Sequence, residues 1–208
     1  MTEGTSRIEA FSDGVFAIAI TLLILEVRLQ HARVEGTLLT ALVALWPYYL
    51  AFALSFFVIL VTWIAHHDLM RMVRVTTRPL QLANGCALVY ITFLPFPTAV
   101  LATHLGGEEF RIAAVFYCGT FVLGSAAFNL LVATIVRGQL LIPGVDAQTI
   151  RRINWAYRIT FTTYVAATLL ALVAPWLALA LTVAVRLLIL SAHPGPAVAS
   201  PERLPQTP

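Results

Sequence analysis

Long apolar runs, separated by short polar connections, make up most of the chain. A bilayer-spanning helix needs roughly 20 mostly apolar residues. Six runs approach or exceed this length, at residues 7–29, 38–66, 79–104, 112–136, 153–173 and 175–192. Pro47 in the second run, and Pro95 and Pro97 in the third, predict kinks or local unwinding because proline lacks a backbone N–H. We expect an all-α integral membrane protein with six transmembrane helices per subunit.

Composition supports this class and excludes a soluble fold. Of the 208 residues, 60% are hydrophobic and only 11% are charged, whereas soluble domains carry roughly a quarter charged residues. The net charge of +3 fits charged loops better than a nucleic-acid-binding patch. Residues 1–192 are predicted to form one transmembrane domain. Residues 193–208 form a polar, Pro-rich tail that is predicted to be disordered because it has too few apolar residues to bury.

Charges in the connections predict the orientation in the membrane. The second and fourth connections are rich in arginine (Arg71, Arg74, Arg78, Arg137, Arg151 and Arg152), and the third is the acidic Gly106-Gly107-Glu108-Glu109. Because cytoplasmic loops favour arginine, the second and fourth connections are expected inside. Both termini are then cytoplasmic, in a multi-pass protein of the inner (plasma) membrane. Arg28 and Arg33, in the first connection, argue against this orientation.

The first run presents three different faces when it is drawn as a helix at ~100° per residue. Small residues form one stripe (Ala10, Gly14, Ala17 and Thr21), and Ile18, Leu22, Leu25 and Leu29 form an aliphatic stripe beside it. Asp13 points to a third side. The aliphatic stripe could contact lipid or neighbouring helices, and the helical wheel alone favours this interpretation. Alternatively, the stripe lines a pore. Aliphatic rings can gate an ion path by dewetting, and a Thr21 hydroxyl can replace water around an ion.

Polar residues gather at one predicted depth on three helices. They are Arg7, Ser12 and Asp13 on the first, Trp63, His66 and His67 on the second, and Asn84 on the third. Buried polar groups must satisfy one another, so we expect a cluster that joins the first helix to its neighbours. A packing role is favoured over direct ion coordination. A gating role fits both, because histidine titrates near neutral pH.

Other polar residues carry weaker predictions. His66 and His67 are adjacent and point ~100° apart on a helix, and five histidines in all are too few for a membrane di-iron enzyme. Neither a metal site nor a cofactor is expected. Arg186 is expected to snorkel toward the inner surface, and Asn129 to form an interhelical hydrogen bond. Cys86 and Cys118 are expected to be small packing residues.

Several motifs give the chain a family resemblance. Arg7-x-x-x-Phe11-Ser12-Asp13 opens the first helix, Trp63-Ile-Ala-His66-His67 lies in the second, and Asn84 and Leu94-Pro-Phe-Pro-Thr98 lie in the third. With these motifs the chain resembles the transmembrane protein 175 family of lysosomal and bacterial potassium channels. The resemblance implies four six-helix subunits around a pore lined by the first helix. It places the hydrophobic constriction at Ile18, Leu22 and Leu25, and the filter threonine at Thr21.

The resulting hypothesis is a potassium-permeable cation channel that conducts passively as a homotetramer. A conventional Thr-Val-Gly-Tyr-Gly filter is absent from the sequence, so selectivity is expected to be weaker or achieved differently. The expected partners are further copies of the chain, the lipid bilayer, potassium, and other monovalent cations or protons; an enzyme is not expected. The alternatives are a proton-coupled secondary transporter that uses Asp13, His66 and His67, and a non-conducting structural membrane protein.

Overall fold

Helices account for most of the chain in the computed structural model, which describes residues 3–28 and 37–192. The prediction of an all-α membrane protein is confirmed. In chain order the elements are α1 (Glu3–Leu22), the 3₁₀ helix η1 (Leu23–Glu26), α2 (Leu38–Ala44), α3 (Trp46–Arg71), α4 (Arg78–Phe93), α5 (Pro95–His104), α6 (Phe110–Arg137), α7 (Ala147–Ala171) and α8 (Pro175–Ala192).

Prolines interrupt the second and third predicted runs, as expected. The second run divides at Leu45, and Pro47 then lies in the first turn of α3, where a missing N–H leaves no helical hydrogen bond unmade. The third divides at Leu94, just before Pro95 opens α5. The predicted end of the second run at residue 66 is wrong, because α3 continues to Arg71. His66 and His67 therefore lie within the helix.

The other helices differ from the prediction mainly at their starts. The Asp146 carboxylate accepts a hydrogen bond of 2.7 Å from the Thr149 backbone N–H, and this N-cap starts α7 at Ala147, six residues before the predicted start at 153. Side-chain oxygens at this position satisfy an otherwise unpaired N–H of the first turn. The predicted disordered tail, residues 193–208, lies outside the described residues.

Four helical stretches in the described part of the chain are long and apolar enough to cross a membrane, namely Thr5–Glu26, Trp46–Arg71, Arg78–His104 and Phe110–Arg137. The apolar stretch of α8 is shorter, over Pro175–Leu187. Helix α7 has 25 residues, but Arg151, Arg152 and Arg158 lower its hydropathy. These criteria support a multi-spanning membrane protein with at least four spans.

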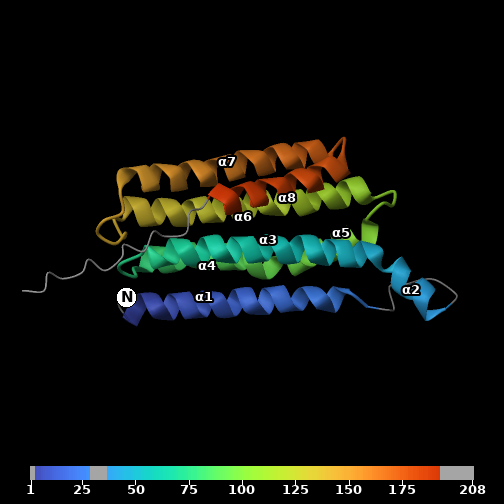
Figure 1. The fold of residues 1–208 in the computed structure, drawn as a ribbon, viewed down its shortest axis with the longest axis horizontal. Coiled ribbons are helices and arrows are strands. Elements are labelled where there is room, and N and C mark those ends of the chain that lie inside the picture. Colours follow the sequence, from blue (N-terminus) through green and yellow to red (C-terminus); the bar gives the residue numbers. More distant parts are fainter. Residues whose placement is uncertain (1–2, 29–36, 193–208) are drawn as a thin grey trace, which may run out of the picture.

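The helices run side by side in an elongated bundle (Figure 1). Helix α1 flanks one side of the bundle and packs against α3 and α4, while α6 packs against α4, α5, α7 and α8. The core between α4, α6 and α7 is largely aromatic. The ring of Phe121 lies between those of Tyr117 and Tyr164, with centroids 4.8 and 5.4 Å away. Thus α1 is attached to the bundle on one side only.

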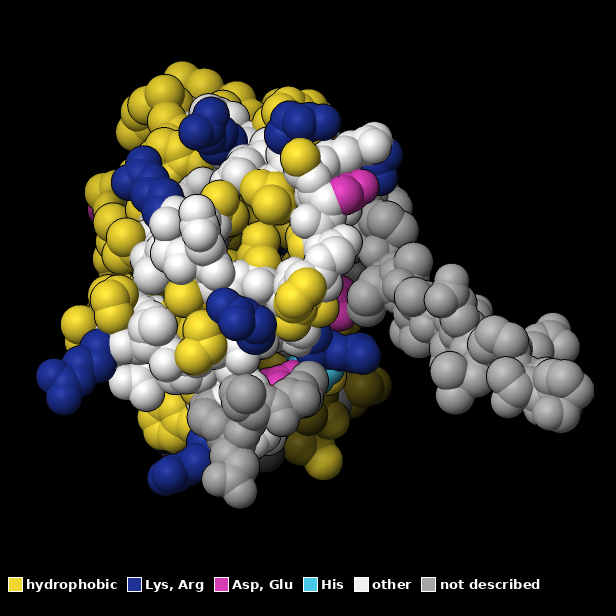
Figure 2. All heavy atoms as spheres, turned by 90° about the vertical axis from the view of Figure 1, so that its left-hand side faces the viewer, with side chains coloured by type: hydrophobic (Ala, Val, Ile, Leu, Met, Phe, Trp, Pro, Cys, Tyr) yellow, Lys and Arg dark blue, Asp and Glu magenta, His cyan; other side chains and the backbone are white. Residues whose placement is uncertain are grey.

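Arginine side chains surround one end of the bundle, which Figure 2 views directly. Helices α3 and α6 end there at Arg71 and Arg137, and α4 begins there at Arg78. The connections after α3 and α6 also pair at this end. The Arg74 N–H donates to the Leu140 carbonyl at 2.7 Å, and the Ile142 N–H donates to the Met72 carbonyl at 2.8 Å. The two arginine-rich connections are therefore joined through their backbones.

The close packing of α4 on α6 depends on Gly124. A Cβ atom at this position would overlap the ring of Tyr90, whereas a Cβ at Gly85 would have no neighbour within 4 Å. Gly124→Ala is therefore expected to destabilise the protein by about 1–3 kcal/mol. Gly85→Ala should be neutral or stabilising, because alanine favours the helix by up to about 1 kcal/mol. Thermal unfolding in detergent distinguishes the two variants, and an equal effect of both would contradict this account.

Candidate ion pathway and polar cluster

Helix α1 has one face that packs on the bundle. Ser12, Phe16, Ala19 and Leu23 are each at most 2% exposed, and their spacings of four, three and four residues place them on one side of a helix. The first three lie against α3 and α4, and Leu23, in the 3₁₀ helix η1 that continues α1, belongs to a segment that packs against α3 and α5. The rotation of α1 about its own axis, which the sequence alone left open, is set by these four side chains.

The predicted constriction residues lie on the face of α1 turned away from the bundle. Ile18 is 61% exposed, Leu22 42% and Leu25 51%, so each has much apolar surface that its own chain does not cover. The small residues Ala10, Gly14 and Ala17 are also exposed. Leu29, the last member of the predicted stripe, lies outside the described residues.

The end of α1 is wound more tightly than the sequence suggested. The chain passes into a 3₁₀ helix over Leu23–Glu26, in which residues i and i+3 eclipse. In a continued α-helix, Leu25 would lie about 60° around the axis from Leu22. The tighter winding brings Leu25 closer to the line of Leu22, on the side that also carries Ile18.

Thr21 is exposed on this surface, and its hydroxyl hydrogen is engaged. The hydroxyl donates to the Ile18 carbonyl at 2.9 Å. A hydroxyl that donates its only hydrogen to the backbone keeps lone pairs available on its oxygen. Thr21 can therefore present an oxygen, rather than a hydrogen, to a cation.

A chain of hydrogen bonds joins α3, α4 and α1 beneath this surface. His66 Nε2 lies 2.8 Å from Asn84 Oδ1, Asn84 Nδ2 donates to Ser12 Oγ at 2.9 Å, and Ser12 Oγ donates to the Ile8 carbonyl at 2.8 Å. Because an amide oxygen only accepts, His66 carries its hydrogen on Nε2. The buried Nδ1 has no partner among the described residues.

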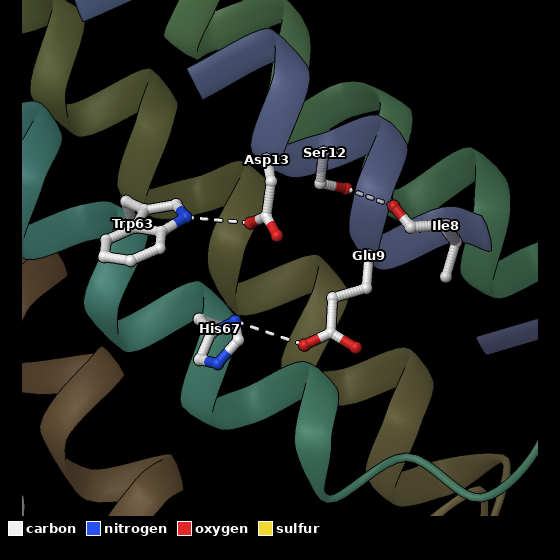
Figure 3. Close-up of polar contacts among 6 residues, drawn as sticks. All are labelled: Ile8, Glu9, Ser12, Asp13, Trp63 and His67. Carbon is white, nitrogen blue, oxygen red and sulfur yellow. Dashed lines mark hydrogen bonds and ion pairs between the residues drawn. The ribbon is translucent and has the colours of Figure 1, made fainter. Parts of the chain in front are cut away.

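Two further contacts join α1 to α3 (Figure 3). Trp63 Nε1 donates to Asp13 Oδ1 at 2.8 Å. One turn away, His67 Nδ1 lies 3.1 Å from Glu9 Oε1, at an angle that does not make a hydrogen bond. This second contact is an ion pair only when His67 is protonated. Glu9 was missing from the predicted cluster, although it lies four residues before Asp13 and thus on the same side of the helix.

The structure thus places six of the predicted polar residues in contacts between helices: Ser12, Asp13, Trp63, His66, His67 and Asn84. Arg7 and Phe11 are exposed, and Phe11 has 66% of its surface accessible. Among the described residues, no three His, Cys, Asp or Glu side chains are arranged to hold a metal ion.

Further polar contacts lie between helices away from this cluster. Ser55 Oγ on α3 lies 2.7 Å from Thr98 Oγ1 on α5 and 2.9 Å from Tyr117 Oη on α6. The sequence did not predict this group, because serine and threonine are common in apolar helices. Asn129 Nδ2 on α6 donates to the Tyr157 carbonyl on α7 at 3.1 Å, which confirms the predicted interhelical hydrogen bond.

Known proteins that are similar to this chain belong to the family that the sequence motifs indicated. A family model described as the endosomal/lysosomal potassium channel TMEM175 matches residues 7–95. A protein of Chamaesiphon minutus named as a potassium channel is 44% identical over 178 residues, which cover 83% of this chain and 87% of that relative. The chain belongs to the TMEM175 family. The resemblance inferred from the sequence is confirmed, and the family is one of ion channels rather than enzymes.

Other TMEM175 proteins show how far the likeness extends. A crystal structure described as a lysosomal potassium-selective TMEM175 homologue from Chamaesiphon minutus superposes with a TM-score of 0.78 at 38% identity. The superposition covers 91% of this chain and 98% of the chain in that crystal structure. A human protein named as an endosomal/lysosomal proton channel is 41% identical over 97 residues, which are 43% of this chain and 19% of the human one. The whole bundle, and not only its first helices, therefore follows the bacterial relative.

Proposed function

We propose that this chain is a subunit of a potassium-permeable channel of the inner membrane, and that ions pass along the exposed face of α1. The observation that carries the proposal is the orientation of α1. Its packed face is fixed on α3 and α4, and this leaves Ile18, Leu22 and Leu25 uncovered. In a family of ion channels, an uncovered aliphatic face that also carries a threonine oxygen fits a pore wall.

The proposed constriction works by dehydration. Rings of aliphatic side chains exclude water from a narrow passage, and an ion must lose part of its hydration shell to cross them. Ile18 forms the tightest ring in this proposal, and Leu22 and Leu25 extend it. Thr21 Oγ lies beside the ring and supplies an oxygen in place of lost water. Such a passage favours the cation that is easiest to dehydrate, and potassium gives up water more readily than sodium.

A pore wall of this kind requires several copies of α1 around one axis. Four copies in cyclic symmetry are proposed, since closed symmetry is the usual way to surround an axis with identical helices. The exposed small residues Ala10, Gly14 and Ala17 permit close approach between neighbouring helices. Six spans per subunit are proposed, which counts α7 and α8 with the four longer apolar stretches. The arginine-rich end and both termini then face the cytoplasm.

The polar cluster is proposed to hold α1 in register with the rest of the subunit. Its hydrogen bonds run from α1 to both helices on which α1 packs. Buried polar groups that satisfy each other specify one arrangement, because any shift leaves some of them unpaired. The cluster therefore fixes the packed side of α1, opposite the proposed pore wall, and is not itself the proposed path of the ion.

Passive flux through the purified protein tests this proposal. In proteoliposomes with a potassium gradient and a voltage-sensitive dye, we expect flux that needs no proton gradient and continues when a protonophore abolishes one. Flux should grow in proportion to the driving force. A proton-coupled transporter that uses Asp13, His66 and His67 would instead show saturable flux with a fixed stoichiometry. Absence of potassium flux from correctly folded protein would contradict both mechanisms.

A further inference from the structure

Arg186 is buried in the bundle on the side away from α1, and no described residue gives it an anionic partner. Only 7% of its surface is exposed, so the predicted snorkelling toward the inner surface is wrong for this residue. Its guanidinium carbon lies 5.2 Å from the centre of the Tyr164 ring on α7. Among the described residues it forms no ion pair, and its Nε has no hydrogen-bond partner.

A small cavity lies beside this arginine. It has a volume of about 30 Å³, and its polar lining is contributed by Thr62, Ser125, Tyr157, Thr160 and Arg186. Helices α3, α6, α7 and α8 each supply part of the wall. The cavity is separate from the proposed pore, because α1 contributes no residue to it.

The cavity wall carries buried hydrogen-bond donors that have no partner among the described residues. Ser125 Oγ, Tyr157 Oη and Arg186 Nε are buried, and none of them has a partner among the described residues. The Thr62 and Thr160 hydroxyls donate to carbonyls of their own helices, at 2.6 and 2.7 Å, so they add two hydroxyl oxygens but no free donor to the wall. Three unused donors, one of them on a cation, therefore line one small cavity.

Charge decides between the possible occupants. Arginine stays protonated in proteins and cannot become neutral by losing its hydrogen. A buried charge without a counter-charge is strongly unfavourable, and contact with one aromatic face offsets only part of that cost. A water molecule would fit the space and satisfy the donors, but it would leave the positive charge uncompensated. A monovalent anion satisfies the donors and balances the charge.

We propose that this cavity binds a small monovalent anion of the halide class, chloride in the cell, held by Arg186 Nε, Ser125 Oγ and Tyr157 Oη. The bound anion links α6, α7 and α8 and stabilises the side of the subunit away from the pore. The channel would then be a cation conductor that uses an anion as a structural ligand. This inference does not depend on the proposed conduction pathway.

Halide-dependent stability tests the proposal. Thermal unfolding of the detergent-solubilised protein is followed by fluorescence of its 4 tryptophans, in potassium chloride and in potassium gluconate of equal ionic strength. Potassium is constant, and gluconate is too large for the cavity. We expect Tm to be higher by about 3 °C in 100 mM chloride, with saturation on titration. Bromide should act similarly and give an anomalous scattering peak beside Arg186.

Arginine variants supply the control. Arg186→Met is expected to lose the halide dependence of Tm, whereas Arg158→Met, at an exposed position on α7, should keep it. If Arg186→Met does not fold, Ser125→Ala and Tyr157→Phe, which each remove one donor, should weaken the halide effect. Equal Tm values of the wild-type protein in chloride and gluconate would overturn the proposal. So would a halide dependence that survives in Arg186→Met, or in both Ser125→Ala and Tyr157→Phe.

Discussion

Ile18→Asn is expected to raise potassium conductance on the order of tenfold and to reduce the preference for potassium over sodium. A tenfold change corresponds to a barrier lower by about 1.4 kcal/mol. In the proposed pore, Ile18 forces ions to lose water. Asparagine is smaller than isoleucine and replaces the apolar ring with amide oxygens and nitrogens that hold water, so ions pass with more of their hydration shell. Sodium holds its water more strongly, so its permeability should increase more than that of potassium.

Ile112→Asn is the matched control for this variant. Ile112 lies on α6 and is 66% exposed, close to the 61% of Ile18, but it has no place in the proposed pore. Bilayer recordings of both variants under potassium and sodium gradients give conductance and relative permeability. If Ile18→Asn behaves like Ile112→Asn, the uncovered face of α1 contacts lipid and the proposed constriction is wrong.

Asn84→Leu is expected to destabilise the protein by about 3 kcal/mol. Asn84 is 2% exposed, and its amide joins His66 on α3 to Ser12 on α1. Leucine has the same branching and number of side-chain heavy atoms, so the change leaves no cavity and the loss comes chiefly from the hydrogen bonds. The fully buried His66 ring would keep an Nε2–H with no acceptor, and a buried donor without a partner costs more than the bond itself contributed.

The measurement is thermal unfolding in detergent, where a loss of this size lowers Tm by about 6–12 °C for a chain of this length. Gln81→Leu makes the same amide-to-leucine change at an exposed position on α4 and should shift Tm little. A small shift for Asn84→Leu as well would mean that the chain of hydrogen bonds from His66 to Ile8 contributes little to stability.

Much of the fold follows from the apolar runs, because a bilayer demands long helices whose backbone groups pair internally. The interruptions at Leu45 and Leu94 were predictable from Pro47 and Pro95, since proline breaks a hydrogen bond inside a helix but is tolerated in the first turn of a new one. The end of α3 was not predictable. Three of residues 67–71 are polar or charged (His67, Asp68 and Arg71) and suggest the end of an apolar span, but the helix continues through them into the arginine-rich end of the bundle.

The candidate site was predictable in part. Buried polar side chains need partners, so Ser12, Trp63 and Asn84 were expected to meet, and they lie in hydrogen-bonded contacts. The partner of each residue depends on how the helices rotate against one another, which periodicity does not specify. Glu9 was therefore missed, and so was the isolation of Arg186 from every described carboxylate. The tightening of α1 at Leu23 has no local sequence signal such as proline or glycine.

The backbone pairing between the connections that follow α3 and α6 has a mechanical consequence. Two hydrogen bonds between Met72–Arg74 and Leu140–Ile142 oppose separation of these helix ends. Helices α3 to α8 should therefore move together when a force acts on one of them. Helix α1 packs against two of these helices, α3 and α4. A push on the α6–α7 connection, from a lipid head group or a bound protein, would reach α3 directly. From there it would pass to α1 through Trp63, which donates to Asp13, and through His67, which lies beside Glu9.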